Sequence, residues 1–329
     1  MAVQAFRLPN LVIAGVGGAG TTSLFSYLAQ HPDVCGSSVK EVQYFAPLKH
    51  GQPLANLDSY ARYFSHCTGE KYAMESTPGY FYGGAVLVAA MRERLSDPRI
   101  LVSLRDPSAR LWSSFNYVRA RLQIEKECSF DDYLERSLDA HRSGLASPDE
   151  FRPYSALATG FYAEHISPWF DAFGPAFRLV FFEDLVEDPR AVIEDVCMWL
   201  DIDPAPAADF DYSVQNRTVL HKSSRVQKLA IRVNNRGERF FRRHPHLKAN
   251  LRQIYYGLNS EREPARFEPA ARRRVDAVYA GANAALAAEL RSRGYDRLPH
   301  WLQVGDALAP KGSGEASADL LGPPQSARP

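Results

Sequence analysis

The chain of 329 residues has few cysteines and no long apolar run. Its four cysteines, Cys35, Cys67, Cys128 and Cys197, form neither a CxxC pair nor a dense framework, so we predict reduced thiols in a cytosolic protein. No apolar stretch approaches the ~20 residues of a membrane-spanning helix. The first residues, MAVQAFRLPN, also lack the apolar core of a signal peptide. We therefore expect a cytoplasmic protein with no membrane partner.

An excess of charge is also absent. The 39 lysines and arginines are balanced by 38 acidic residues, which leaves a net charge of +1. Because no overall field draws such a protein to nucleic acid or to an anionic membrane, any anion site has to be built locally. Lysine itself is scarce: eight of the 39 basic residues are lysines, so few side chains offer a primary amine.

The apolar residues follow a pattern that is typical of an α/β protein. Hydrophobic residues make up 45% of the chain, which suits a large buried core. Three apolar runs are each followed by a polar turn and a segment with helical spacing. The expected strands cover residues 11–14, 100–104 and 178–182, and the expected helices cover 21–30, 109–122 and 189–200. Since no hairpin signal separates these units, we predict a central parallel sheet with helices on both faces.

The C-terminal part changes in composition. Residues 269–293 are rich in alanine and arginine and predict a helix, whereas the chain after Trp301 is rich in glycine, serine, alanine and proline. We expect one domain over residues 1–304 and a disordered tail over residues 305–329.

A glycine-rich segment, GVGGAGTTS, covers residues 15–23 between the first expected strand and helix. Glycines allow a tight turn, and the backbone N–H groups at a helix N-terminus attract phosphate. A Walker A loop would need lysine where Thr21 stands, which disfavours an ATPase or an ordinary kinase. The Rossmann pattern GxGxxG is matched, but no acid ends a second strand ~20 residues later. An NAD(P)-dependent oxidoreductase is therefore a distant alternative.

A second motif follows the second expected strand. It reads RDPxxRxxS, in which Arg105 offers a planar charged fork for phosphate oxygens and Ser113 lies two helical turns further on. Together with GxxxxGTTSL, this motif resembles the nucleotide-binding motifs of sulfotransferases that use 3′-phosphoadenosine 5′-phosphosulfate (PAPS). Further segments resemble the same family in the same order: KEVQYF at 40–45, ESTPGY at 75–80, and GFY at 160–162 followed by FEDL at 182–185. The resemblance spans residues 8–302.

The resemblance implies a P-loop-like sulfotransferase fold and a set of site residues. The loop that holds the 5′-phosphosulfate would contain Gly17, Gly18, Ala19, Gly20, Thr21, Thr22 and Ser23. The 3′-phosphate would be held by Arg105 and Ser113, the adenine would lie against Tyr162, and a loop with Lys222, Ser224 and Arg225 would close over the nucleotide. Glu41 would act as the base that takes the proton of the acceptor hydroxyl, and Glu75 is the alternative carboxylate. No metal is expected.

One feature departs from the family. Sulfotransferases usually carry lysine just before the Gly-Thr-Thr turn, where this chain has Gly18, and Ser76 stands at the position of a second lysine of the heparan-type enzymes. Lys40 or Lys222 could supply the missing charge, or the helix N-terminus could suffice for a reactive acceptor. The third possibility is a non-catalytic protein that binds PAPS or its product, 3′-phosphoadenosine 5′-phosphate (PAP). We favour an enzyme that acts on the hydroxyl of a small molecule or carbohydrate. The sequence gives no sign of oligomeric state.

Overall fold

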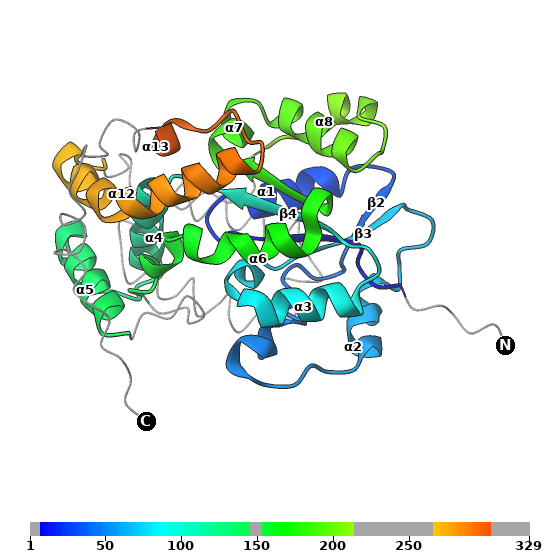
Figure 1. Ribbon diagram of the computed structural model, residues 1–329, viewed down its shortest axis with the longest axis horizontal. Helices are drawn as coiled ribbons and strands as arrows, with labels where there is room; N and C mark the ends of the chain where they lie inside the picture. The colour runs from blue at the N-terminus through cyan, green and yellow to red at the C-terminus, as the bar shows by residue number, and fades with distance from the viewer. Residues whose placement is uncertain (1–6, 145–152, 214–265, 304–329) are drawn as a thin grey trace, which may run out of the picture.

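The computed structural model describes residues 7–144, 153–213 and 266–303 (Figure 1). In this part of the chain, five strands form one parallel sheet in the order β2-β3-β1-β4-β5. The strands are β1 (Leu11–Gly15), β2 (Val34–Gly36), β3 (Tyr72–Ser76), β4 (Arg99–Leu104) and β5 (Phe177–Phe181). The prediction of an α/β fold with a central parallel sheet is confirmed.

Helices connect the strands and flank the sheet (Figure 1). Their bounds are α1 Thr21–Leu28, α2 Leu57–Ala61, α3 Gly84–Arg94, α4 Pro107–Ala120, α5 Phe130–Arg142, α6 Ala163–Phe173, α7 Phe182–Glu187, α8 Pro189–Trp199, α12 Pro269–Ser292 and α13 His300–Gln303. Short 3₁₀ helices include η1 Ala46–His50, η2 Arg62–Phe64, η3 Pro78–Tyr82, η4 Ala158–Gly160, η5 Gly174–Ala176 and η6 Ala205–Asp209. The expected helices over 109–122 and 269–293 correspond to α4 and α12.

Both faces of the sheet are covered. Helices α1 and α8 pack on one face, where Leu24 and Ile193 are fully buried, and α3 and α6 pack on the other, where Met91 and Trp169 are fully buried (Figure 1). Every residue of β1 is therefore buried, which explains why its sequence is a continuous aliphatic run instead of an alternating one.

A third apolar cluster holds α4 against α5 and α12, through side chains that include Leu111, Phe115, Tyr133 and Tyr279. Helix α4 begins at Pro107 because Asp106 caps it: the Asp106 carboxylate accepts hydrogen bonds from the N–H groups of Ser108 and Ala109. This cap and cluster fix the helix that carries the RDPxxRxxS motif.

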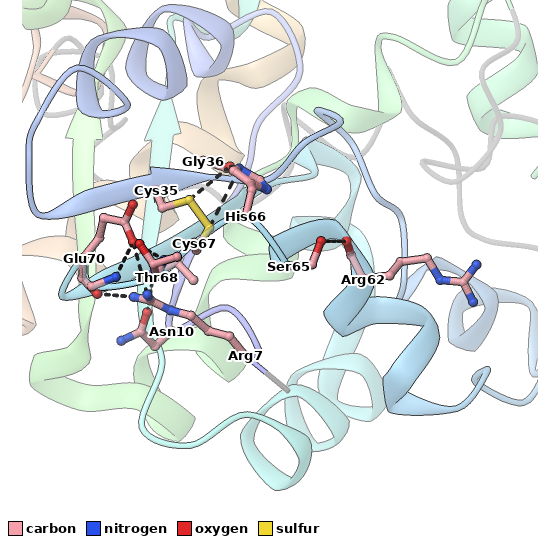
Figure 2. The surroundings of a disulfide bond; sticks show 12 residues. Arg7, Asn10, Cys35, Gly36, Arg62, Ser65, His66, Cys67, Thr68 and Glu70 are labelled. Atoms are coloured by element: carbon pink, nitrogen blue, oxygen red, sulfur yellow. Dashed lines mark hydrogen bonds and ion pairs between the residues drawn. A yellow bond between two sulfur atoms is a disulfide. The ribbon is translucent and has the colours of Figure 1, made fainter. Parts of the chain in front are cut away.

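The cysteine prediction is wrong for two of the four thiols. Cys35, on β2, and Cys67, just after η2, form a disulfide with a Cα–Cα distance of 5.7 Å (Figure 2). The pair is 32 residues apart in sequence, so only the fold brings the two residues together. Cys128 and Cys197 are free and buried. Disulfides are typical of oxidising compartments, so cysteine usage no longer supports a cytosolic location.

Within the described residues, no helix is both long enough and apolar enough to cross a bilayer. The predicted tail over 305–329 and the predicted nucleotide-closing loop with Lys222, Ser224 and Arg225 lie outside the described residues.

Candidate functional site

The candidate site lies where the carboxyl ends of the central strands meet. The chain runs from β1 outward to β2, returns to β3 beside β1, and then crosses to β4 on the other side of β1. In open α/β sheets, ligands bind at such a switch point, beyond the carboxyl ends of the strands. The glycine loop begins at the last residue of β1, the ESTPGY segment covers the last two residues of β3 and the turn after them, and the RDP turn follows β4.

The sheet order also bears on the dinucleotide alternative. A Rossmann fold places its second strand beside the first, with an acid at its end for the ribose. Here β2 lies at the edge of the sheet, β3 separates it from β1, and it ends at Gly36. The chain therefore has the GxGxxG spacing but not the strand order of a Rossmann fold.

The glycine loop is tied to β4 and closely packed. The Val16 N–H donates to the Ser103 carbonyl (2.8 Å), and the Ser103 hydroxyl donates to the Ala19 carbonyl (2.6 Å). Gly18 and Gly20 have φ angles of 83° and 78°, in the left-handed region that favours glycine. Gly20 precedes α1, whose first N–H groups, on Thr21, Thr22 and Ser23, have no partner within the helix. This loop has the backbone geometry of an anion cradle.

Arg105 joins the two motifs. Its Nη1 donates to the Gly18 carbonyl at 3.0 Å, and its guanidinium lies over the Phe182 ring with 4.4 Å between the Cζ and the ring centroid. Burial lowers the pKa of Arg105, an effect that the charge of Glu183 opposes. The guanidinium stays protonated and points at the loop.

The RDP turn is anchored from several directions. The Asp106 N–H donates to Glu183 Oε1 (2.9 Å), and the Asp106 carboxylate pairs with Arg272 of α12. Glu183 therefore joins α7 to this turn, whereas Asp188 is the residue that caps α8. Ser113 lies half-buried on α4, one turn after the buried Arg110.

Lys40 and Glu41 lie beyond β2, next to the end of β3. The Glu41 N–H donates to the Ser76 carbonyl (3.0 Å), and the Gln43 N–H donates to Thr77 Oγ1 (3.2 Å). Glu41 and Gln43 have φ angles of 62° and 58°, which are uncommon for residues with a side chain and cluster at functional sites. The Glu41 side chain is 49% exposed and pairs with Lys40 Nζ at 3.0 Å. A solvent-accessible carboxylate thus stands at the edge of the sheet.

With this geometry established, the chain was compared with known proteins. The family model described as Sulfotransferase domain matches residues 8–246. The chain belongs to the sulfotransferase domain family. The crystal structure of a sulfotransferase from Alicyclobacillus acidocaldarius superposes with a TM-score of 0.63 at 23% identity, covering 90% of this chain and 99% of that one. This likeness supports the sulfotransferase fold.

Curated relatives include heparan sulfate enzymes. Human bifunctional heparan sulfate N-deacetylase/N-sulfotransferase 3 is 27% identical over 60% of this chain and 23% of its own length. Mouse heparan sulfate glucosamine 3-O-sulfotransferase 3B1 is 27% identical over 58% of this chain and 45% of its own length. A membrane-associated sulfotransferase, kil1 of Dictyostelium discoideum, is 25% identical over 44% of this chain. This chain thus spans about a quarter to a half of the length of the first two relatives.

Glu75, the alternative carboxylate of this sulfotransferase, lies inside the protein. It has no exposed surface and accepts hydrogen bonds from Thr77 Oγ1 (2.6 Å), from the Tyr80 hydroxyl (2.9 Å) and from the Tyr60 hydroxyl. Burial raises the pKa of Glu75, and the three hydroxyl donors partly offset this effect. Thr77 Oγ1 also accepts the Gln43 N–H. Glu75 is therefore linked through Thr77 to the loop that carries Glu41.

Tyr162 occupies a similar supporting position. Its side chain is 1% exposed, its hydroxyl donates to the Arg105 carbonyl (3.0 Å), and its ring packs against Trp301. The hydrogen bond links Tyr162 to the RDP turn, and its place against the adenine stays a prediction.

Two polar side chains at the site had no functional role in the sequence analysis beyond their place in motifs. Ser76 Oγ and Arg110 Nε are both buried, and neither atom has a hydrogen-bond partner among the described residues. The motif spacing placed both residues near the loops, but burial without a partner is visible only in the fold.

Proposed function

We propose that this sulfotransferase moves a sulfuryl group from PAPS to a hydroxyl of a small-molecule or carbohydrate acceptor. The observation that carries the proposal is the contact between Arg105 and the Gly18 carbonyl, because it joins the two phosphate-type motifs at one edge of the sheet. Family membership supports sulfuryl transfer. The proposal adds the donor, the acceptor class and the residue roles.

The donor would bind along the glycine loop. The 5′-phosphosulfate would lie against the N–H groups and hydroxyls of the loop that runs from Gly17 through Gly18, Ala19, Gly20, Thr21 and Thr22 to Ser23. Arg105 and Ser113 would bind the 3′-phosphate, which distinguishes PAPS from an ordinary adenine nucleotide. Tyr162 would support this site by holding Arg105.

Glu41 is the proposed base. The acceptor hydroxyl gives its proton to the Glu41 carboxylate while its oxygen bonds to sulfur, and the bond between sulfur and the 5′-phosphate oxygen breaks. PAP leaves with the electron pair of that bond. Glu41 is favoured as the base over the buried Glu75 because the Glu41 side chain is exposed at the edge of the sheet. Lys40, which is paired with Glu41, would orient the base and add positive charge. The proposed step uses no metal.

The acceptor and the location are further parts of the proposal. One of the relatives acts, by its name, on a glucosamine oxygen of heparan sulfate, so a carbohydrate hydroxyl is one acceptor to test. We keep the prediction of a cytoplasmic enzyme without nucleic-acid or membrane partners, although the disulfide weakens its basis.

Thermal unfolding in the presence of PAP, PAPS, NAD⁺ or NADP⁺ tests the nucleotide site. At hundredfold excess over its dissociation constant, a specific ligand stabilises the folded state by about 2.7 kcal/mol. We expect this shift with PAP and PAPS only. Stabilisation by NADP⁺ alone would contradict the proposal. Transfer of labelled sulfate to a panel of hydroxyl acceptors then separates the enzyme from a binding protein, which would show the PAP shift without product.

A further inference from the structure

A buried positive charge lies against the glycine loop. Arg110, on the first turn of α4, is 4% exposed. Its Nη2 donates to the Ala156 carbonyl and to Thr159 Oγ1, both at 2.7 Å. Its Nε, in contrast, is a buried donor with no hydrogen-bond partner among the described residues. The hydrogen bonds of Arg110 are therefore incomplete in the protein alone.

Arg110 also has no counter-charge within the described ranges: no carboxylate there forms an ion pair with it, and Asp106 is paired with Arg272 instead. The neighbouring titratable groups include the hydroxyls of Tyr82, Tyr162 and Tyr279, each of which donates to a backbone carbonyl. The guanidinium of Arg105 adds a second positive charge nearby.

Burial raises the pKa of all three tyrosines, so they stay neutral. Taking a charge out of water without an opposite charge beside it is costly. Such an arrangement indicates that the opposite charge arrives with a ligand.

The stem of Arg110 runs past the loop at Gly18. A Cβ built on Gly18 would lie 3.3 Å from Arg110 Cγ and 3.9 Å from Cδ, and the unpartnered Nε is the next atom along. Because Gly18 also has a positive φ, a side chain at this position would be both strained and crowded. Arg110 thus occupies the space that a residue at position 18 would need.

We propose that Arg110 supplies, from the α4 side of the glycine loop, the positive charge that stabilises the phosphate oxygen leaving sulfur. This inference rests on the proposed function. As the bond between sulfur and the 5′-phosphate breaks, the oxygen keeps the electron pair and gains negative charge, while the guanidinium keeps all its protons and acts by its field. The acceptor's proton still goes to Glu41.

Arg110→Met tests the charge, with Arg110→Lys as the variant that keeps it and Arg119→Met, further along α4, as the control. Losing one preorganised charge at a developing oxyanion lowers kcat by roughly 10²–10³-fold. We expect such a loss in Arg110→Met, a smaller loss in Arg110→Lys and none in Arg119→Met. Arg110→Met loses the hydrogen bonds to Ala156 and Thr159, so kcat is measured well below its unfolding temperature. PAP should stabilise this variant less than it stabilises the wild type.

Moving the charge to the loop gives a second arm. Gly18→Lys alone should not raise kcat, because the Arg110 stem crowds position 18 and Arg110 already supplies the charge. Gly18→Lys combined with Arg110→Ala, which removes that stem, should recover at least tenfold over Arg110→Ala. Unchanged kcat in Arg110→Met, a tenfold gain in Gly18→Lys alone, or a loss of kcat that follows a lower unfolding temperature would overturn the inference. If the wild type itself neither binds PAP nor transfers sulfate, the proposed function fails instead.

Discussion

Adding one methyl group should lower the stability of the protein at Gly20 but leave it nearly unchanged at Gly17, in the same loop. Gly20 has a φ of 78°, and a Cβ there would lie 2.8 Å from Leu185 Cδ2 and 3.0 Å from Phe182 Cδ2. Gly17 lies on the open side of the loop, has no positive φ, and would place a Cβ at least 4 Å from other atoms. Gly20→Ala therefore disturbs packing against α7, whereas Gly17→Ala changes only the surface that a ligand meets.

The size of each effect follows from this geometry. A left-handed conformation costs a residue with a side chain about 1–2 kcal/mol, and overpacking adds about 1–3 kcal/mol. Gly20→Ala should thus lose roughly 2–5 kcal/mol, or on the order of 3–7 °C in Tm for a chain of 329 residues. Gly17→Ala should lie within about 0.5 kcal/mol of the wild type or be slightly more stable.

Thermal unfolding and PAP calorimetry on both variants give the answer. We expect Gly20→Ala to lose stability, and Gly17→Ala to keep its stability but bind PAP more weakly, because its methyl group stands between the backbone and phosphate. Equal stability of the two variants would refute the packing argument. Undiminished PAP affinity in Gly17→Ala would refute close contact between this part of the loop and the nucleotide.

Four further predictions follow from the site and the disulfide. Arg105→Ala should remove most of the preference for PAP over adenosine 5′-phosphate, since a charged hydrogen bond contributes ~1.5–3 kcal/mol; calorimetry that finds the preference intact contradicts the 3′-phosphate role. Glu41→Gln should lower kcat by roughly 10²–10⁴-fold with nearly unchanged PAP affinity, and a larger loss of kcat in Glu75→Gln would make Glu75 the base. The raised pKa of Glu75 favours its protonated form in the folded state. Its stabilising contribution is therefore complete below the unfolded pKa near ~4.3 and is lost as pH rises through the folded pKa. The Tm of Glu75→Gln minus the Tm of the wild type should increase with pH, and a difference that does not change with pH would contradict this prediction. Replacing Cys35 and Cys67 by serine should cost about 3–4 kcal/mol for a loop of this length, and a reducing agent should lower the Tm of the wild type but not of the double variant.

The sequence was informative where local signals and burial agreed. Strand β1 and strand β4 are aliphatic runs, and α4 begins with an Asp-Pro cap, so these elements could be placed within a few residues. Because parallel strands end at the same edge, the loops after β1 and β4 lie close together, but the contact of Arg105 with the Gly18 carbonyl is seen only in the fold.

The elements that the sequence did not reveal depend on tertiary contacts. Strand β3 contains Glu75, whose charge disguises a buried strand until the hydroxyls that surround it are known. Strand β2 has three residues, too few for a periodic pattern. Glutamate rarely adopts a positive φ, and arginine is rarely buried. The positive φ of Glu41 and the burial of Arg110 therefore could not be predicted from local sequence.

The backbone contacts of the site explain how this sulfotransferase could lose the loop lysine and keep the geometry of the loop. Val16 donates to the Ser103 carbonyl, and Glu41 donates to the Ser76 carbonyl, so both loops are attached to strand ends by main-chain atoms. These bonds do not involve a side chain at position 18, where the positive φ and the Arg110 stem favour glycine. The shape of the site and the source of its positive charge are therefore separable, and a cation on a neighbouring helix can replace one on the loop as long as its field reaches the same oxygen.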